Sequence, residues 1–288
     1  MGNLFIGTAG WSYPDWEGIA YPKARAGDRL RLMAGYLDCV EVDSSFYRPP
    51  TSRMTARWAQ ATPPEFRFVA KAWQRFTHQR DSKWSQADLE LFLGGFAPLR
   101  DRLDALLFQF PWSFRDTANN RDWLAKIADA FAEWPVAVEI RHDSWADVDF
   151  FRQHRLIYCN VDQPQLNHCV PATAIVTADT GYYRLHGRNA TNWFRDNKDV
   201  YGARYDYLYT EAELAGLLPQ IQAVAAKTKN TFVIFNNHKH GKAFANALQL
   251  KAALLPGATL RAPATLVARY PRLHGRIISD GDQQLSFV

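Results

Sequence analysis

Short apolar runs alternate with longer, often amphipathic segments along the whole chain. Eight of these runs are typical of β-strands, because each starts with apolar residues and ends in polar or aromatic ones. They cover residues 5–11, 39–47, 67–73, 105–111, 137–145, 157–164, 182–189 and 231–238. Strands that alternate with helices predict a parallel sheet, and eight such units favour a single α/β domain of the TIM-type (β/α)8 barrel class. An open, doubly wound sheet is the alternative fold.

The segments between the strands predict helices. Thr51 and Ser85 are expected N-caps, and Asp28 and Asn120 are expected to open two further helices. Apolar residues then recur at helical spacing, which predicts a face that packs on the sheet. These residues are Leu30, Met33 and Leu37 after Asp28, and Trp123, Ile127, Phe131 and Trp134 after Asn120. Residues 242–255, rich in Ala and Leu, predict a strong last helix.

Two connections and the tail depart from this alternation. Residues 165–181, between the sixth and seventh strands, predict an irregular connection without a helix. Residues 187–210, after the seventh strand, form a long loop whose aromatic content argues against disorder, and long loops in compact domains are usually functional. We expect residues 1–255 to form the barrel domain. Residues 256–288 are expected to form an Arg- and Pro-rich extension whose structure the sequence does not predict.

Composition narrows the class of protein. A chain of 288 residues suits one barrel, and no run of about 18 apolar residues predicts a membrane span. The first residues lack the layout of a secretory signal, and three cysteines without metal-ligand spacing suggest reduced thiols. We therefore expect a cytoplasmic protein that does not enter a membrane. Its net charge of +5 permits an anionic partner. The oligomeric state is not predicted.

Polar residues interrupt the strands near their carboxyl ends. Residues two apart in a strand point to the same face, so Glu41 with Asp43, and Glu139 with Arg141, are expected to face the barrel axis. The same alternation predicts inward positions in five further strands for Lys71, Gln109, Asn160 with Asp162, Arg184 with His186, and Asn236. The carboxyl ends of the strands form the active-site face of such barrels. We therefore expect a polar and catalytic mouth there.

The charged residues of this mouth predict acid/base chemistry. Paired carboxylates serve as general acid and base, for example in glycoside hydrolysis, when a cation keeps one ionised and burial keeps the other protonated. The candidate catalytic residues are Glu41, Glu139, His186, Lys71 and Asp162. The candidate substrate-binding residues are Trp11, Tyr13, Asp43, Tyr47, His78, Gln109, Arg141, Arg184, Arg188, Trp193, Tyr207, Asn236 and Asn237. A salt-bridge lattice that plugs the barrel without chemistry is the alternative.

The sequence implies no redox cofactor and predicts no metal site. Carboxylates with His186, joined by His142 or His238, could hold a divalent metal, but the neighbouring cations disfavour it. The turn at residues 238–242 precedes a helix and could hold a phosphate, with Arg188 opposite. No GxGxxG, Walker-type loop, zinc ribbon or GxSxG motif occurs, which disfavours nucleotide-hydrolase and serine-hydrolase classes.

Aromatic and basic residues are interleaved in the long loop after the seventh strand. Arg188, Arg195 and Arg204 among its aromatic residues could bind a single-stranded nucleic acid by stacking and charge neutralisation. The same rings could stack on a sugar or pack as a covering segment. Nucleic acid is therefore an alternative partner to a polar or anionic small molecule.

Several motifs together resemble the YecE-like family, catalogued as domain of unknown function 72, whose members are β/α barrels. The resemblance runs from about residue 4 to residue 250. It rests on Gly7, Trp11, Tyr13 and Trp16; Glu41 with Phe46 and Tyr47; Lys71 with Thr77 and His78; Gln109 with Pro111; Glu139, Arg141, His142 and Trp145; Arg184, Leu185, His186 and Gly187; and Asn236 and Asn237 with Asn246 and Ala247. It implies the barrel fold but no activity. The tail after Leu255 goes beyond what the family pattern leads us to expect.

Three functions agree with these observations. The first is an enzyme of hydrolase or isomerase/lyase type that acts on a polar, anionic small molecule such as a sugar, a sugar phosphate or a nucleotide. The second is a nucleic-acid-binding or processing protein, and the third is a non-catalytic barrel with a structural polar plug.

Overall fold

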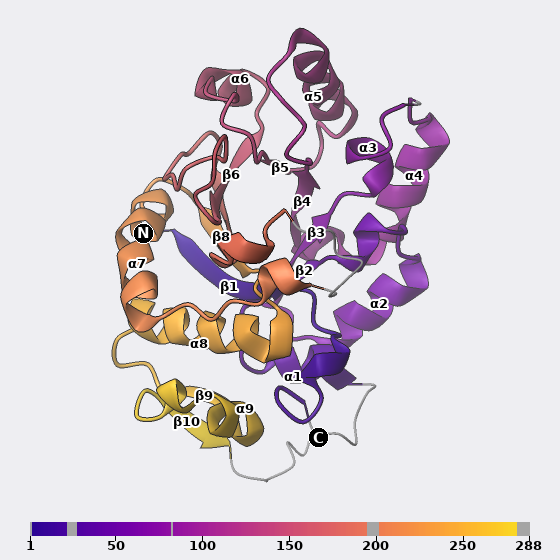
Figure 1. The fold of residues 1–288 in the computed structure, drawn as a ribbon. Coiled ribbons are helices and arrows are strands. Elements are labelled where there is room, and N and C mark those ends of the chain that lie inside the picture. The colour runs from indigo at the N-terminus through magenta and orange to yellow at the C-terminus, as the bar shows by residue number, and fades with distance from the viewer. Residues whose placement is uncertain (1, 22–27, 82, 195–201, 281–288) are drawn as a thin grey trace.

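A closed parallel barrel of eight strands forms the centre of the molecule (Figure 1). The computed structural model describes residues 2–21, 28–81, 83–194 and 202–280. Each strand pairs with the next one along the chain, and β8 closes the ring against β1. The strands are β1 (Asn3–Ala9), β2 (Cys39–Val42), β3 (Arg67–Lys71), β4 (Leu103–Gln109), β5 (Val136–Glu139), β6 (Ile157–Asp162), β7 (Thr180–Leu185) and β8 (Asn230–Phe235). The predicted TIM-type barrel is confirmed.

The predicted strands extended too far at their carboxyl ends. β2 ends at Val42 rather than at position 47, because the 3-10 helix η3 (Ser44–Phe46) begins two residues later. β5 ends at Glu139, six residues before the predicted end. Polar and aromatic residues continue the strand-like pattern into these loops, although the loops leave the barrel sheet, and the loop after β5 pairs only through an isolated bridge of His142 with Cys169. Asp43 and Arg141 consequently lie just beyond their strands, at the mouth.

Helices follow every strand except β6, and they surround the barrel. They are α1 (Arg29–Ala34), α2 (Ser52–Ala61), α3 (Gln74–Thr77), α4 (Gln86–Gly95), α5 (Ala118–Ala130), α6 (Val148–Gln153), α7 (Glu211–Ala225) and α8 (Lys242–Leu254). Thr51 and Ser85 cap α2 and α4, as predicted. The prediction for α5 was wrong, since Thr117 is its cap and accepts the N–H of Asn120. Asp28 precedes α1 but makes no side-chain cap bond.

The connections between β6 and β7 and between β7 and α7 are irregular, as predicted. Residues 163–179, between β6 and β7, contain no helix. The described parts of the β7–α7 connection contain two short 3-10 helices, η5 (Ala190–Asn192) and η6 (Ala203–Tyr205). Arg195 lies outside the described residues.

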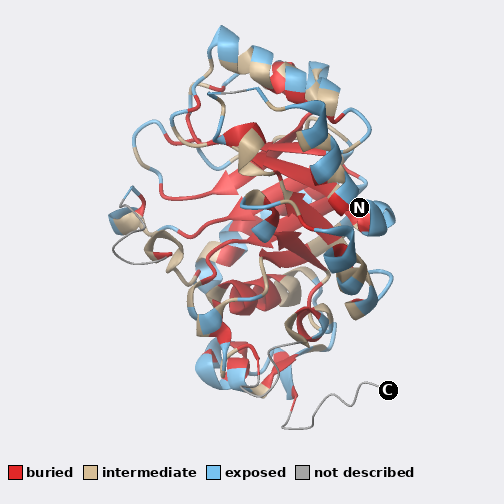
Figure 2. Cartoon of the chain, turned by 90° about the vertical axis from the view of Figure 1, so that its right-hand side faces the viewer, coloured by how far each residue is buried: buried red, intermediate tan, exposed pale blue. Residues whose placement is uncertain are grey.

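The barrel strands and the inner faces of the helices form the buried core (Figure 2). One apolar cluster joins the barrel interior to the helices that follow β3, β4 and β5. Within it, Phe131 meets Phe76 and Phe108 edge to face, with ring centroids 5.2 and 4.9 Å apart. A second cluster lies between the barrel and helices α7 and α8. Among the described residues, no helix is both long and apolar enough to cross a membrane.

The tail folds into a small unit beside α8 (Figure 1). It contains β9 (Leu260–Pro263), α9 (Ala264–Arg269), the 3-10 helix η8 (Pro271–Leu273) and β10 (Ile277–Asp280), and β9 and β10 pair in parallel. Leu266 and Leu273 join the apolar cluster of α8, and Asp280 accepts a hydrogen bond from Tyr36. The division of the chain at residue 255 stays a prediction.

Candidate active site at the barrel mouth

A buried ion network crosses the barrel interior. Arg184 of β7 binds Glu41 of β2 through Nη2–Oε1 (2.6 Å) and Nε–Oε2 (3.0 Å), and Glu139 of β5 through Nη1–Oε2 (2.6 Å). Tyr182 of β7 donates its hydroxyl to Glu41 at 2.8 Å. Neither carboxylate has exposed surface. The inward positions predicted for Glu41, Glu139 and Arg184 are confirmed, and protein donors bind all four carboxylate oxygens.

Two further side chains, those of Arg141 and His186, contact Glu139 on the side nearer the mouth of the barrel. Arg141 donates to Oε1 of Glu139 through Nε (2.8 Å), and its Nη2 lies 2.7 Å from the same oxygen as an ion pair. His186 Nε2 lies 3.3 Å from the same oxygen, and His186 Nδ1 lies 3.0 Å from the amide nitrogen of Asn236. His186 Nε2 also lies 3.4 Å from Arg141 Nη2, so the imidazole contacts Glu139, Arg141 and Asn236. Glu139 therefore fixes the positions of three side chains.

The environment separates the pKa values of the two buried acids. Burial raises the pKa of Glu41, and Arg184 offsets this only in part. Burial also acts on Glu139, but Arg184 and Arg141 outweigh it and hold the pKa of Glu139 well below its usual range. Burial lowers the pKa of His186 to about 3, against the attraction of Glu139. Near neutral pH Glu139 is thus ionised and His186 uncharged.

A second charged pair lies at the rim. Lys71 Nζ is 3.5 Å from Asp43 Oδ1 and 4.2 Å from the ring centre of Phe46. The His78 ring meets Phe46 edge-on at 4.9 Å. Burial opposes the charge of Asp43, but Lys71 and Arg184 outweigh it and lower the pKa of Asp43. Burial, followed by the charges of Lys71 and Arg141, lowers the pKa of His78 to about 4. The rim thus carries a 30% exposed carboxylate and a neutral imidazole.

An open hollow of about 560 Å³ lies over Arg141 at the carboxyl ends of the strands. Its lining comes from the end of β4, from the segments that follow β3, β4 and β5, and from the β7–α7 connection: His78, Gln109, Pro111, Trp112, Arg141, Trp193, Phe194, Arg204 and Tyr205. The guanidinium of Arg141 lies 5.2 Å from the ring centre of buried Trp193. The structure therefore brings together predicted residues from four loops.

The parity predicted for β6 was wrong. Cys159 lies close enough to Glu41 and Glu139 to feel their charges, so Cys159 faces inward and Asn160 and Asp162 face outward. Asn160 Oδ1 accepts hydrogen bonds from Thr173 Oγ1 (2.7 Å) and Ile175 N (2.8 Å) in the helix-free β6–β7 connection. The polar side chains of β6 thus bind the outer connection instead of the axis.

Asp162 belongs to an outer cluster that holds the base of the β7–α7 connection. Arg188 binds both Asp162 oxygens, at 2.7–3.2 Å, and Tyr209 donates to Asp162 Oδ1 at 2.7 Å. The Tyr209 oxygen also accepts the N–H of Gly187 at 2.8 Å. A Cβ at Gly187 (φ +85°) would lie 2.5 Å from the Tyr207 Cβ, so this position requires glycine. Asp162, Arg188 and Tyr207 thus lie apart from the inner network.

Other predicted residues also lie outside the hollow. Asn237 donates to the Tyr207 carbonyl and to Asn246, on the outer side of β8. Trp11 packs edge-on against Trp58 of α2 at 5.3 Å. Tyr13 stacks on His238 at 4.5 Å. Tyr47 is 67% exposed.

The turn at residues 238–242 is already engaged by protein groups. The backbone N–H of His240 donates to Asp15 Oδ2 at 2.7 Å, and the N–H of Gly241 donates to the His238 carbonyl at 3.2 Å. The carboxylate of Asp15 thus takes the place that we expected for a phosphate. Arg188 is bound to Asp162 and does not lie opposite as a free anion ligand.

A possible metal-ligating group lies at the edge of the mouth. Among the described residues, the group of three such side chains is His142, Asp143 and His168, whose ligand atoms lie within 4.8 Å of one another. However, His142 Nδ1 accepts the N–H of Ser144 at 3.1 Å, and the other two side chains are exposed. Glu41, Glu139 and His186 are not part of it, so a metal at the predicted carboxylates gains no support.

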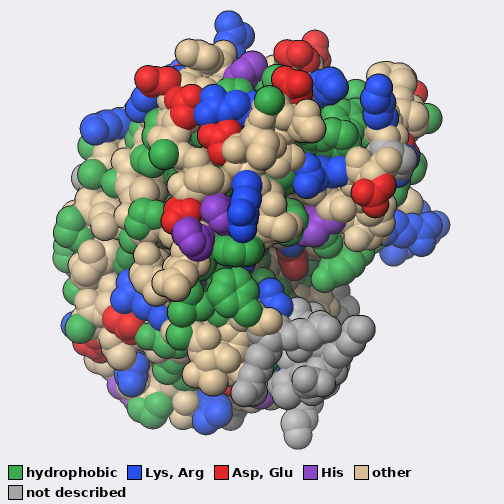
Figure 3. All heavy atoms as spheres, turned by 45° about the horizontal axis from the view of Figure 1, so that its top comes forward, with side chains coloured by type: hydrophobic (Ala, Val, Ile, Leu, Met, Phe, Trp, Pro, Cys, Tyr) green, Lys and Arg blue, Asp and Glu red, His purple; other side chains and the backbone are tan. Residues whose placement is uncertain are grey.

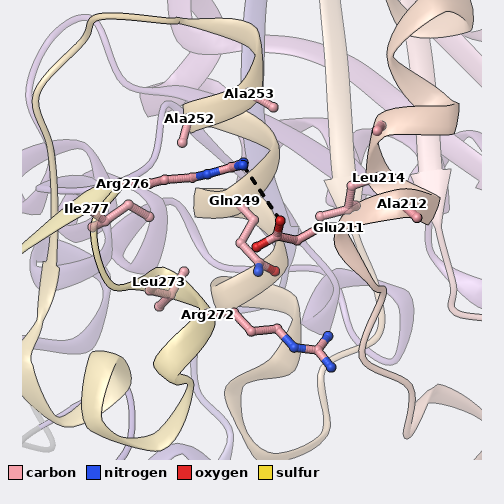
Figure 4. A pocket seen from close by; sticks show the side chains of 11 residues that line it. Glu211, Ala212, Leu214, Gln249, Ala252, Ala253, Arg272, Leu273, Arg276 and Ile277 are labelled. Carbon is pink, nitrogen blue, oxygen red and sulfur yellow. Dashed lines mark ion pairs between the residues drawn. The ribbon is translucent and has the colours of Figure 1, made fainter.

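A second hollow lies between α7, α8 and the tail (Figure 4). Alanine and leucine side chains line it, together with Gln249 and Arg272, and an Arg276–Glu211 ion pair of 3.6 Å crosses it. It contains none of the predicted site residues and lies away from the strand ends. The mouth over Arg141 is therefore the better candidate site.

Sequence reasoning missed several residues of the site. Tyr182 alternates with Arg184 in β7, so the same alternation could have found it. Trp112 and Phe194 lie in loops and Tyr205 in η6, where no periodicity applies, so the sequence carried no signal that placed them at the mouth. Arg204, which the sequence suggested as a ligand of nucleic acid, also lies in η6 and lines the hollow.

Comparisons with known proteins agree with this architecture. The family model described as "Protein of unknown function DUF72" matches residues 5–267. The UPF0759 protein YunF of Bacillus subtilis (strain 168) is 30% identical over 266 residues, covering 86% of this chain and 93% of YunF. The UPF0759 protein YecE of Escherichia coli (strain K12) is 26% identical over 140 residues, or 48% of each chain.

Solved structures give the same result. A DUF72 family protein from Thermotoga maritima MSB8 has a TM-score of 0.80 and 34% identity, covering 88% of this chain and 99% of that one. A DUF72 family protein from Enterococcus faecalis V583 has a TM-score of 0.78 and 30% identity, with 87% and 95% covered. The resemblance expected from the motifs is confirmed, and the chain belongs to the DUF72 family of proteins of unknown function.

Proposed function

We propose that the barrel mouth binds a small anionic molecule and performs acid/base chemistry on it. The observation that carries this proposal is the position of Arg141 in the floor of the hollow, held by Glu139 and Trp193. A guanidinium that is already fixed loses little conformational entropy when it binds a ligand. Since Nε and Nη2 of Arg141 face Glu139, a carboxylate or a phosphate group would bind at Nη1.

The neighbouring charges favour an anion. Arg204 lines the same hollow, and Lys71 lies near His78 at its side. Burial, followed by the charges of Lys71, Arg141 and Arg80, lowers the pKa of His78 and keeps the ring uncharged, so His78 would contact the ligand as a neutral hydrogen-bonding group. Glu139 is bound to Arg184 and Arg141, so its charge is already compensated inside the barrel.

Asp43 lies at the rim beside Lys71, outside the lining of the hollow, and is the carboxylate that we propose for proton transfer. It is partly exposed, and its lowered pKa keeps it ionised as a general base. Glu41 and Glu139, which the sequence suggested as the acid/base pair, are enclosed, so we assign them the positioning of Arg184 and Arg141 instead. Hydrolase and isomerase/lyase reactions remain the proposed classes.

Nucleic-acid binding has less support. Arg188 is engaged by Asp162 and Glu213, and basic and acidic side chains are interspersed on the face shown in Figure 3. A single-strand groove would instead need a continuous row of available cations. The three described cysteines are buried and free, which supports the expected reducing, cytoplasmic location.

A thermal-shift assay with inorganic phosphate and ribose 5-phosphate tests the proposal. A ligand at a hundred times its Kd stabilises a protein by about 2.7 kcal/mol. We expect stabilisation of the wild type, loss of this shift in Arg141→Gln and Arg204→Gln, and retention in Arg100→Gln. Arg100 packs on Trp134 at the opposite end of the barrel and serves as the matched control.

Two results would contradict the proposal. One is the absence of any shift with either anion at moderate salt, and the other is an equal shift in wild type and both mouth variants. Binding of a single-stranded oligonucleotide that disappears with added salt would favour the alternative.

A further inference from the structure

The hollow over Arg141 has an aromatic wall that the binding of a simple anion does not explain. Phe194 lines the hollow and is 59% exposed. Its ring meets Trp112 at 75°, with centroids 5.8 Å apart. Tyr205 lines the same hollow.

Trp112 holds this wall in a fixed orientation. Its Nε1 donates to the His168 carbonyl at 3.1 Å, and its ring contacts His142 at 4.9 Å and the guanidinium of Arg115 at 5.6 Å. His168, His142 and Arg115 thus hold the Trp112 side chain in place. The ring of Phe194 is therefore the surface on which a ligand could stack, and Trp112 forms the side of that surface.

We infer that the ligand carries a flat aromatic ring next to its anionic group, as a nucleoside monophosphate does. This inference rests on the proposed function, since Arg141 binds the anion. A base that stacks on Phe194 would cover apolar surface that is now in water. Loss of such a stacking ring typically lowers affinity roughly 5- to 150-fold.

Isothermal titration with AMP, UMP and ribose 5-phosphate at one salt concentration tests the inference. We expect the tighter of the two nucleotides to bind at least about tenfold more tightly than ribose 5-phosphate. Phe194→Ala should remove this difference and leave the affinity for ribose 5-phosphate unchanged, whereas Phe194→Trp should keep it. Because Phe194 is exposed, neither change disturbs the core.

The control is Trp134→Ala, which removes a half-buried indole at the opposite end of the barrel and should keep the difference. Equal affinity of the wild type for all three ligands would overturn the inference and leave the proposed function standing. A difference that persists in Phe194→Ala would overturn it too. If no phosphate binds, the proposed function itself fails.

Discussion

Arg184 and Glu41 form a two-point ion pair across the barrel interior, with Nη2–Oε1 at 2.6 Å and Nε–Oε2 at 3.0 Å. The pair joins β7 to β2, and neither side chain is more than 1% exposed. Because the same guanidinium binds Glu139, one cation compensates two buried carboxylates. We therefore expect the replacement of Arg184 to cost more stability than the replacement of either acid alone.

Replacement of Arg184 by Met should be strongly destabilising. It leaves two carboxylates buried with one fewer cation, and breaking a buried pair in this way costs about 3–5 kcal/mol. The decrease in the free energy of unfolding should be smaller at pH 5 than at pH 8, because the carboxyl groups of Glu41 and Glu139, once they have lost Arg184, can bind protons at the lower pH. Urea unfolding measures both quantities. A loss below about 1 kcal/mol at pH 8 would contradict the idea of a tightly compensated network.

Glu139→Gln should cost more stability than Glu41→Gln. Glu139 binds two arginines and faces His186, whereas Glu41 binds Arg184 and Tyr182. We expect the two variants to differ by at least about 2 kcal/mol in the free energy of unfolding at pH 7.

The pH dependence of the two variants should also differ. Burial raises the pKa of Glu41 in the folded state, so the free energy of unfolding of the wild type falls as the pH rises through that folded-state pKa. The difference in stability between the wild type and Glu41→Gln should therefore become smaller at higher pH. The pKa of Glu139 is lowered, so its contribution persists at every pH above its unfolded value and is lost only in acid. Urea unfolding of both variants from pH 5 to pH 8 tests this. Equal costs at all pH values would show that the two acids are equivalent.

The barrel was predictable because its strands are buried on both faces and interrupted by loops at regular intervals. The strand ends were less predictable, since Phe46 and Tyr47 continue a strand-like pattern in a loop that leaves the sheet. The cap of α5 was misplaced by three residues because Thr117 and Asn120 are both good capping residues. Local sequence does not decide between them.

The inner network was predictable where a charge interrupts an apolar strand, as Glu41 and Glu139 do. In β6 the same rule failed, because Asn160 finds its partners in the distant β6–β7 connection and Asp162 finds Arg188 and Tyr209. Such partners depend on the fold as a whole. For the same reason, the sequence could not place Phe194 or Tyr205 beside Arg141.

Asp104 should make stability depend on pH near 6. It lies on β4 at the amino-terminal end of the barrel, where burial raises its pKa to about 6 and Arg67, 3.8 Å away, offsets this only in part. The folded state thus holds a proton that the unfolded chain has released, and the associated stability is lost as the pH rises through 6. Between pH 5 and pH 8 the loss should be about 1.4 kcal/mol.

Asp104→Asn should remove this loss. Urea unfolding at both pH values measures it, with Asp101→Asn as the control, because Asp101 is an exposed acid in the preceding turn. If Asp104→Asn and the wild type lose the same stability between pH 5 and pH 8, Asp104 does not hold the proton.

Asp162→Asn should loosen the β7–α7 connection more than it weakens the barrel. Asp162 lies outside the inner network and binds Arg188 and Tyr209 at the two ends of that connection. Neutralising it removes a charge-assisted pair, so hydrogen exchange of residues 187–194 and 202–209 should accelerate at least about tenfold, while β1–β5 keep their protection. Tyr209→Phe should give a smaller effect, since Arg188 keeps its partner.

Asp38→Asn, which breaks an ion pair with Lys251 away from this connection, is the control and should leave both segments unchanged. Uniform acceleration across the barrel would instead mean that Asp162 stabilises the fold as a whole, and the anchoring role would be wrong.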